Sequence, residues 1–290
     1  MEDSRTTPTT SKCDSRLSRL KDWLNEKNLA LPYAHVVLGS GLALPLQDLE
    51  MKDWSFEGEI SFSELPGMTS STAPGHKGTY RFYKKGTRVV SFQVGRLHGF
   101  EGNKASDVVK PVLTLADLGV EKFIITNAAG SLQTHMKAGS VMLINDHVNF
   151  TGLNPLTGPN DESLGPRFPD MSQIYSPRIN KILEKHLNKH NVETHFGIYI
   201  GVNGPSFETP AEINLFSNWG MGSVGMSTVF EAIALKHRSK EIGGLSFLAN
   251  MGAGLGEKAG DTLTGEEVLE AGRQTAPSIL KAIFESLETL

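Results

Sequence analysis

The chain has 290 residues, of which 39% are hydrophobic and 21% charged, and this composition excludes a mostly disordered protein. The net charge is −4, so the chain has no excess of the basic residues that displace counterions from nucleic acid. We therefore expect small-molecule ligands instead. Cys13 is the single cysteine, which excludes an intrachain disulfide and favours a reducing cytoplasm, and no apolar run is long enough to span a membrane.

The N-terminal residues 1–12 are polar and rich in threonine. They lack the apolar segment of a secretory signal. We interpret them as a disordered tail that precedes one domain at residues 13–290.

Strand and helix patterns alternate along that domain. Short apolar runs bounded by glycine predict strands, and apolar residues at helical spacing predict the helices between them. The predicted strands lie at 35–42, 79–95 (a hairpin), 122–130, 140–146, 195–202, 223–227 and 243–250. The predicted helices begin after Asp14, near Val108, at Ser176 and at the capping boxes Thr209–Glu212, Thr228–Glu231 and Thr264–Glu267. The alternation predicts a single-domain α/β fold with a mixed central sheet, in large part parallel, flanked by helices.

Two features interrupt this alternation. Residues 149–172 form a long stretch rich in Pro, Gly, Asn and Asp, and so long a loop inside a compact domain is usually functional or disordered. Pro277 lies within the last helical pattern, where we expect it to kink the helix.

Four of the predicted strands end in glycines and polar residues, at 39–41, 95–99, 126–130 and 225–228. Open α/β sheets bind ligands beyond the carboxyl ends of their strands, and exposed N–H groups there favour anions. The Gly39-Ser40-Gly41 turn lacks the third glycine of a dinucleotide fingerprint and the Gly-Lys-Ser/Thr of a phosphate-binding loop. An NAD-dependent dehydrogenase and a nucleoside triphosphatase are therefore excluded.

Four side chains near these turns are candidates for ligand contacts. Arg96 and His98 are two residues apart in extended chain, so they point the same way and suit a phosphate or carboxylate; the alternative is a surface arginine and a core histidine. Glu208 precedes a helix and can accept hydrogen bonds from ligand N–H groups, or it is a surface acid that stabilises the helix dipole. Asn250 ends an apolar strand and offers both a donor and an acceptor, or it only shapes a turn.

His186 and His190 have the i, i+4 spacing that can bind zinc. The sequence offers no third ligand, and Lys185 and Lys189 flank the pair. We therefore expect a solvated helix face and no metal site.

Taken in order, several segments together resemble the purine nucleoside phosphorylase family of the homotrimeric type, over roughly residues 14–275. They are GVNGPSFETPAE at 201–212, VGMSTVFEAIALKH at 224–237, GRLHGFEG at 95–102, TNAAGSL at 126–132 and the loop sequences LNPLTGPND and RFPDMS within 153–172. The resemblance implies phosphorolysis of purine ribonucleosides such as inosine and guanosine, which yields free base and ribose 1-phosphate. It also implies no cofactor, a homotrimer and a cytoplasmic enzyme.

The same resemblance implies a role for individual residues. Glu208, Asn250 and His98 would be catalytic. Phosphate would be held by Ser40, His76, Arg96, His98, Asn127, Ala128 and Ser227; the purine by Phe207, Glu208, Asn250 and Ala129; and the ribose by Phe100, Tyr199, Met226 and a neighbouring subunit's counterpart of Phe168.

This assignment fits the chemistry of the reaction. An N-glycosidic bond breaks through a cationic sugar, which a phosphate dianion beneath it stabilises. Negative charge that develops on the leaving purine needs a hydrogen-bond donor, and the Asn250 amide supplies one. Glu208 can accept from the N1–H group of a 6-oxopurine, which adenine lacks.

Three positions depart from the family pattern, and they affect the ribose more than the phosphate or base. Gly265 replaces a histidine that contacts the 5′-hydroxyl, Phe100 replaces a tyrosine, and Ala249 replaces a threonine. Two alternatives follow. The first is a 5′-methylthioadenosine phosphorylase, which Gly265 favours but Glu208 and Asn250 do not; the second is a non-catalytic nucleoside-binding protein.

Overall fold

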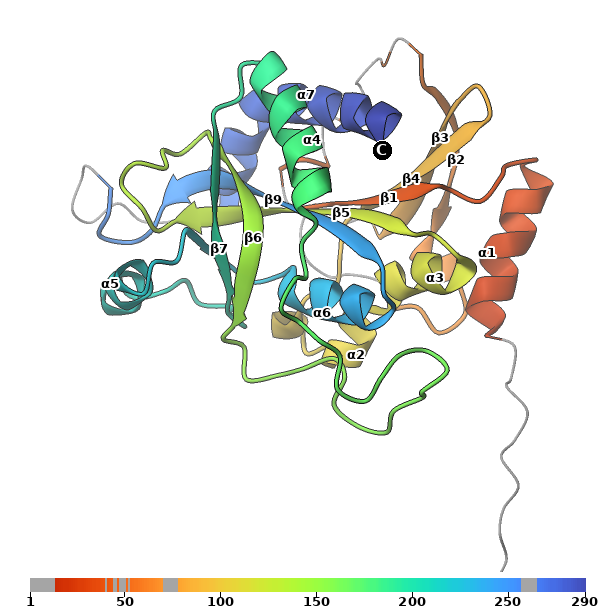
Figure 1. Ribbon diagram of the computed structural model, residues 1–290, viewed down its shortest axis with the longest axis horizontal. Helices are drawn as coiled ribbons and strands as arrows, with labels where there is room; N and C mark the ends of the chain where they lie inside the picture. Colours follow the sequence, from red (N-terminus) through yellow and green to blue (C-terminus); the bar gives the residue numbers. More distant parts are fainter. Residues whose placement is uncertain are drawn as a thin grey trace, which may run out of the picture.

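A nine-stranded mixed sheet runs through the centre of the molecule, and helices lie on both of its faces (Figure 1). The computed structural model describes residues 14–39, 41–43, 46, 51, 53–69, 78–256 and 265–290. Strands from distant parts of the sequence pair with one another, and the order across the sheet is β2-β3-β4-β1-β5-β8-β7-β6-β9.

The first half of the sheet is built around β1 (Ala34–Leu38), which is buried along its whole length. It is parallel to β4 (Arg88–Val94) on one side and to β5 (Lys122–Ser131) on the other. The hairpin of β3 (Thr79–Lys85) with β4, and its neighbour β2 (Ser55–Ser61), extend this half as antiparallel strands. The short helix η2 (Phe62–Glu64) follows β2.

The second half closes on itself as a ring of strands. From β5 the pairings run to β9 (Glu241–Met251), β6 (Val141–Asn149), β7 (Thr194–Gly201) and β8 (Ser223–Gly225), and β8 pairs again with β5. The pairs β5–β9, β6–β7 and β7–β8 are parallel, whereas β6–β9 and β5–β8 are antiparallel. β5 therefore belongs to both halves.

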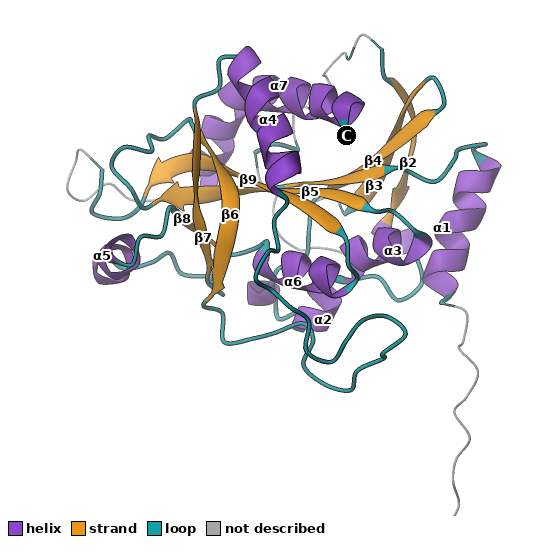
Figure 2. Cartoon of the chain, viewed as in Figure 1, coloured by secondary structure: helices purple, strands orange, loops and turns teal. Residues whose placement is uncertain are grey.

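The helices form two layers (Figure 2). One face carries α1 (Ser15–Glu26), α2 (Ala105–Val108), α3 (Lys110–Leu118) and α6 (Val229–His237), and the other carries α4 (Pro177–Lys189) and α7 (Gly265–Thr289). α5 (Pro210–Asn218) lies outside the ring, beyond β7 and β8. Each layer buries its own apolar core against the sheet.

Local sequence signals explain where several helices begin and end. Asp14 caps α1 by accepting a hydrogen bond from the Arg16 amide, and Ser176 caps α4 immediately before Pro177. α3 ends at Gly119, which has the positive φ of 110° that a glycine adopts easily. The predicted starts of α1 and α4 are confirmed.

Most of the predicted elements are confirmed, including the hairpin, the mixed sheet and the capping box of Thr209 with Glu212. Two predictions about the bounds and caps of these elements are wrong. β5 continues as a strand to Ser131 and does not turn at 126–130, because β8 and β9 pair with its end. Thr228 makes no side-chain cap to α6, since its backbone has a φ of 71° and its hydroxyl is turned elsewhere.

Other predictions are untested. Residues 1–12, Ser40, His76 and the capping box that starts at Thr264 lie outside the described residues. α7 runs through Pro277 without ending there, and the kink remains a prediction. Within the described ranges, no helix combines the length and apolar character needed to cross a membrane.

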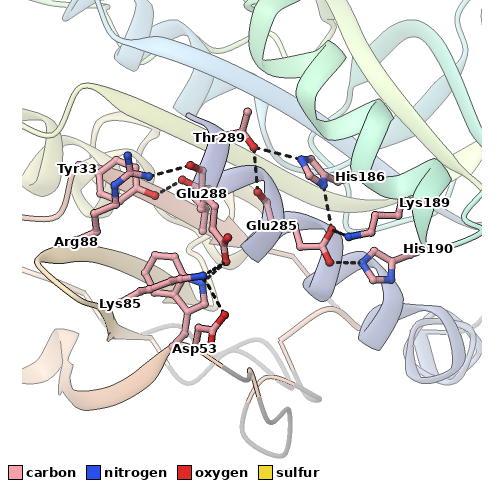
Figure 3. A network of polar contacts seen from close by, with 12 residues as sticks. Tyr33, Asp53, Lys85, Arg88, His186, Lys189, His190, Glu285, Glu288 and Thr289 are labelled. Atoms are coloured by element: carbon pink, nitrogen blue, oxygen red, sulfur yellow. Dashed lines mark hydrogen bonds and ion pairs between the residues drawn. The ribbon is translucent and has the colours of Figure 1, made fainter.

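Glu285 on α7 ties that helix to α4 (Figure 3). Its carboxylate lies 3.0 Å from His186 Nδ1, 2.9 Å from Lys189 Nζ and 3.1 Å from His190 Nε2. The prediction that the two histidines lie on a solvated helix face is therefore wrong, because a carboxylate far away in sequence packs against them. Partial burial would raise the pKa of Glu285, but the hydrogen bonds from Lys189, His186 and His190 outweigh it and lower the pKa to about 2.

The C-terminal turn of α7 is anchored to the hairpin in the same view (Figure 3). Lys85 lies 2.7 Å from Glu288 and 3.1 Å from Asp53, and Arg88 donates to the Glu288 carbonyl at 2.9 Å. Tyr33 donates to the carbonyl of Leu287. These contacts fix the end of α7 over the first half of the sheet.

We predict a pH-dependent cost for Glu285→Gln. At pH 7 the variant is less stable by about 1 kcal/mol, which lowers Tm by about 2–4 °C. The pKa of Glu285 falls from its ordinary 4.5 to about 2 on folding, so its contribution is full above pH 4.5 and is lost as the pH falls toward 2. Thermal melts over this range check the prediction, with Glu184→Gln on α4 as the control; a Tm difference that is independent of pH contradicts it.

Candidate active site

The residues of interest surround one cavity between the ends of β4 and β8 and the start of α6. The space between the atoms there totals about 320 Å³, the part open to solvent included. Arg96, His98, Met226 and Ser227, all predicted site residues, line it. The remaining lining residues are Leu97, Gly99, Val108, Thr151, Val202, Asn203, Thr228, Val229, Phe230 and Glu231.

The antiparallel pairing of β8 with β5 brings the distant segments together. Val224 pairs with Gly130 and Ser223 with Ser131, so the chain that leaves β8 runs back alongside the preceding residues of β5. Gly225 also lets the Tyr199 side chain of β7 pack against the end of β8, because a Cβ atom there would lie 2.6 Å from the hydroxyl of Tyr199. The segment 226–228 consequently lies beside Asn127.

Arg96 follows β4 directly after Gly95 and is almost completely buried. Its Nη1 donates to the carboxylate of Glu231 at 3.1 Å, and its Nη2 donates to the carbonyl of Thr126. Glu231 on α6 is only 1% exposed. Burial raises the pKa of Glu231, whereas the Arg96 charge lowers it, and the pair fixes the guanidinium at the wall of the cavity.

His98 is held by the short helix η3 (Gly99–Glu101) that follows it. Glu101 accepts a hydrogen bond from the His98 amide at 2.9 Å and lies 3.0 Å from its Nδ1. Phe100 stacks on the imidazole with ring centroids 4.6 Å apart. Burial, reinforced by the charge of Arg96, lowers the pKa of His98 to about 4, so the ring is neutral at pH 7.

Thr228 connects three of the site segments through its hydroxyl. Oγ1 lies 2.8 Å from Asn127 Nδ2, 3.4 Å from Arg96 Nη1 and 3.2 Å from Ser227 Oγ. The amide of Ser227 donates to the hydroxyl of Tyr199 at 3.3 Å. Asn127 is thus linked to the cavity wall although it does not line the cavity itself.

The residues expected at the purine lie apart from this cavity; Phe207, Glu208, Ala129 and Asn250 are absent from its lining. Asn250 lies opposite Gly130 in the β5–β9 pairing, and one of its amide protons goes to the Met251 carbonyl at 2.8 Å. Glu208 is half-buried, and this burial raises the pKa of its carboxyl group.

The residues expected at the ribose occupy different environments. Met226 lines the cavity, whereas Tyr199 is fully buried and contacts the amide of Ser227. Phe168 is 88% exposed in the loop after β6, with the Arg167 guanidinium 5.8 Å from its ring centroid. Ala128 is paired within β5 and β9.

Sequence reasoning missed Glu231 and Thr228, which it interpreted as a capping box. One signal was available. Glu231 interrupts the apolar run VFEAIAL at 229–235, and an acid in the middle of a buried helix requires a buried partner. In the part of the chain that the structure describes, no group of three or more His, Cys, Asp or Glu side chains is placed to hold a metal ion.

Comparison with known proteins assigns the chain to a family. Residues 38–285 match the family model described as the phosphorylase superfamily. Purine nucleoside phosphorylase 1 of Geobacillus stearothermophilus is 37% identical over 92% of this chain and 94% of its own length. The purine nucleoside phosphorylase of Bos taurus is 37% identical over 89% of each chain.

Solved structures agree with the sequence comparison. The Schistosoma mansoni purine nucleoside phosphorylase in complex with adenosine superposes with a TM-score of 0.83 at 28% identity, over 96% of this chain and 98% of that one. A schistosomal purine nucleoside phosphorylase in complex with hypoxanthine gives a TM-score of 0.80 at 30% identity, over 93% and 96%. The chain belongs to the phosphorylase superfamily and, within it, to the purine nucleoside phosphorylase family.

We predict that Glu231→Ala destabilises the protein by about 3–5 kcal/mol, because it leaves Arg96 as a buried charge without its carboxylate. Glu231→Gln keeps an acceptor for the guanidinium and should cost less. Urea unfolding monitored by circular dichroism measures both variants. Glu241→Ala serves as the control, since its pair with Arg178 is partly exposed and should contribute about 1 kcal/mol or less; equal losses at the two sites would contradict the prediction.

Proposed function

We propose that this protein catalyses the phosphorolysis of 6-oxopurine ribonucleosides such as inosine and guanosine. Inorganic phosphate and the nucleoside would yield the free base and ribose 1-phosphate. The observation that carries the proposal is the convergence of Arg96, His98 and Ser227 on one cavity in a chain of the purine nucleoside phosphorylase family. Membership in the family makes phosphorolysis the expected reaction, and the site residues suggest the substrate.

In the proposed reaction, phosphate attacks the anomeric carbon of the sugar while the bond to the purine nitrogen breaks. The sugar becomes cationic in the transition state, and a phosphate dianion in the cavity stabilises it by direct attraction. Arg96 and Ser227 would hold that dianion, together with His98, Asn127 and the backbone of Ala128. Ser40 and His76 complete the proposed phosphate site.

The base would be held by Glu208 and Asn250, with Phe207 and Ala129 beside it. One Asn250 amide proton is used by the Met251 carbonyl, which leaves the second for the purine as negative charge develops on it. The Glu208 carboxylate would accept from the N1–H of hypoxanthine or guanine. Phe100, Tyr199 and Met226 would lie on the ribose side.

A second substrate class is a 6-aminopurine nucleoside, including 5′-methylthioadenosine. Two observations favour it. A related structure contains adenosine, and this chain has Gly265 where the family resemblance implies a histidine that contacts the 5′-hydroxyl. A non-catalytic nucleoside-binding protein is the remaining alternative.

We further propose a homotrimer in which Phe168 reaches the active site of a neighbouring subunit. Large exposed hydrophobic residues support an interface near the loop after β6 and around α5. They are Phe150, Leu153, Leu164, Phe168, Phe207, Leu215 and Trp219. The reaction needs no cofactor besides its co-substrate phosphate, and the single cysteine is compatible with a reducing cytoplasm.

A nucleoside panel tests the proposed function. Inosine, guanosine, adenosine and 5′-methylthioadenosine are incubated with and without phosphate, and base release is followed by absorbance. We expect phosphate-dependent release of hypoxanthine and guanine and much slower release from the adenine nucleosides, because adenine offers Glu208 no N1 proton. Faster turnover of the adenine nucleosides would favour the second class, and binding without turnover would favour the non-catalytic protein.

Glu208→Ala distinguishes a base contact from a general loss of function. It should lower kcat/KM for inosine about 100-fold, the size expected when a buried base N–H group loses its charged acceptor, with adenosine turnover little changed. Equal losses for both nucleosides would contradict the assigned role of Glu208.

Phe168→Ala tests the contribution of a neighbouring subunit. We expect kcat/KM for inosine to fall about tenfold or more through loss of aromatic contact, whereas the KM for phosphate stays the same. Leu164→Ala in the same loop is the control. Light scattering establishes the oligomeric state, and a fully active monomer would refute this part of the proposal.

A further inference from the structure

We infer that Thr228 is a positioning residue for the anion site, because its side chain orders Ser227 so that the Ser227 hydroxyl donates into the cavity. This inference deepens the proposed function and rests on it. It concerns a residue that the sequence placed in a helix cap and that the proposed phosphate set does not contain.

The backbone at Thr228 has an unusual conformation. Its φ of 71° and ψ of −48°, with the Val229 amide donating to the Ser227 carbonyl at 2.8 Å, define a three-residue γ-turn with positive φ. Such a turn is strained for any β-branched residue and costs about 1–3 kcal/mol. Glycine adopts it without this cost, so the threonine side chain must supply something that glycine cannot.

The Thr228 hydroxyl is turned away from the helix that it precedes. It makes no hydrogen bond to the first turn of α6, where an N-capping threonine would accept one from the backbone. Thr228 is 2% exposed, and Oγ1 instead contacts Asn127, Arg96 and Ser227. These residues follow or belong to three different strands, β5, β4 and β8.

The donors and acceptors in this cluster fix the direction of each hydrogen bond. A hydroxyl has one proton and two lone pairs. Arg96 Nη1 and Asn127 Nδ2 can donate hydrogen bonds but cannot accept them. Both lone pairs of Thr228 Oγ1 therefore accept from these nitrogens, at 3.4 and 2.8 Å. The single Thr228 proton is then directed to Ser227 Oγ, 3.2 Å away.

This order determines what Ser227 offers a ligand. Its amide is already used by the Tyr199 hydroxyl, and its Oγ accepts from Thr228, so the Ser227 hydroxyl proton is directed elsewhere. Ser227 lines the cavity, and a phosphate oxygen is an acceptor that this proton suits. Thr228 thereby orients the Ser227 hydroxyl so that it donates a hydrogen bond to a ligand. It also fixes the side chains of Arg96 and Asn127 beside Ser227.

Three variants of Thr228 separate positioning from folding. Thr228→Val removes the hydroxyl but keeps the shape, Thr228→Gly removes it and also relieves the strained φ, and Thr228→Ser keeps it. We expect Val and Gly to raise the KM for phosphate about tenfold or more, with the KM for inosine within about twofold of wild type. Ser should restore most of the affinity, and Gly should have a Tm equal to or above that of wild type.

A double-mutant cycle tests whether Thr228 acts through Ser227. Ser227→Ala alone should weaken phosphate binding, and Thr228→Val should then add less than about threefold. An unchanged phosphate KM in the Val and Gly variants, failure of the Ser variant to restore affinity, or a full additional loss in the Ser227→Ala background would each overturn the inference.

Direct titration with inorganic phosphate separates this inference from the proposed reaction. If the wild type turns over no nucleoside but binds phosphate, the proposed function fails, and the Kd values of the same variants decide the role of Thr228. A wild type that neither turns over nucleosides nor binds phosphate would refute both.

Discussion

The antiparallel return of β8 along the end of β5 is the constraint on which the cavity depends. β1 pairs with β5 only as far as Ile125, so beyond that residue β5 is open on the side where β1 lay. The short strand β8 pairs with Gly130 and Ser131 and sends the following residues back toward Asn127. This reversal brings Ser227 close to Arg96, to which Thr228 links it.

The site that this reversal creates contains groups whose burial or backbone conformation lowers the stability of the fold, and the rest of the structure compensates for that cost. An arginine and a glutamate are both 1% exposed, and burial of such a pair brings little net stability. A threonine in a strained turn adds a further cost. Both features coincide with the cavity, which is the pattern expected where a protein keeps polar groups preorganised for an anion.

The ring of strands and the two helix layers supply that stability. The α7 helix packs on the same core as β1 and β4, and polar contacts of Glu285 and Glu288 hold it against α4 and the hairpin. These contacts lie on the opposite side of the sheet from α6, which begins at the cavity. The polar contacts that hold α7 and the residues that line the cavity therefore lie in different layers.

The sequence by itself predicted the order of strands and helices, most of their boundaries and the segments that carry the family resemblance. It could do so because the spacing of apolar residues, the helix caps and the glycine turns are local properties. The strand-end turns by themselves indicated an anion site, and the resemblance assigned Arg96, His98 and Ser227 to it. The sequence did not reveal the partner of Glu231, the role of Thr228 or the contact of Glu285 with His186. Tertiary structure decided these features, since each depends on contacts between segments far apart in the chain. The local S/T-x-x-E spacing at Thr228 predicts a helix cap, but in the folded protein its hydroxyl bonds to Asn127 and Arg96 instead.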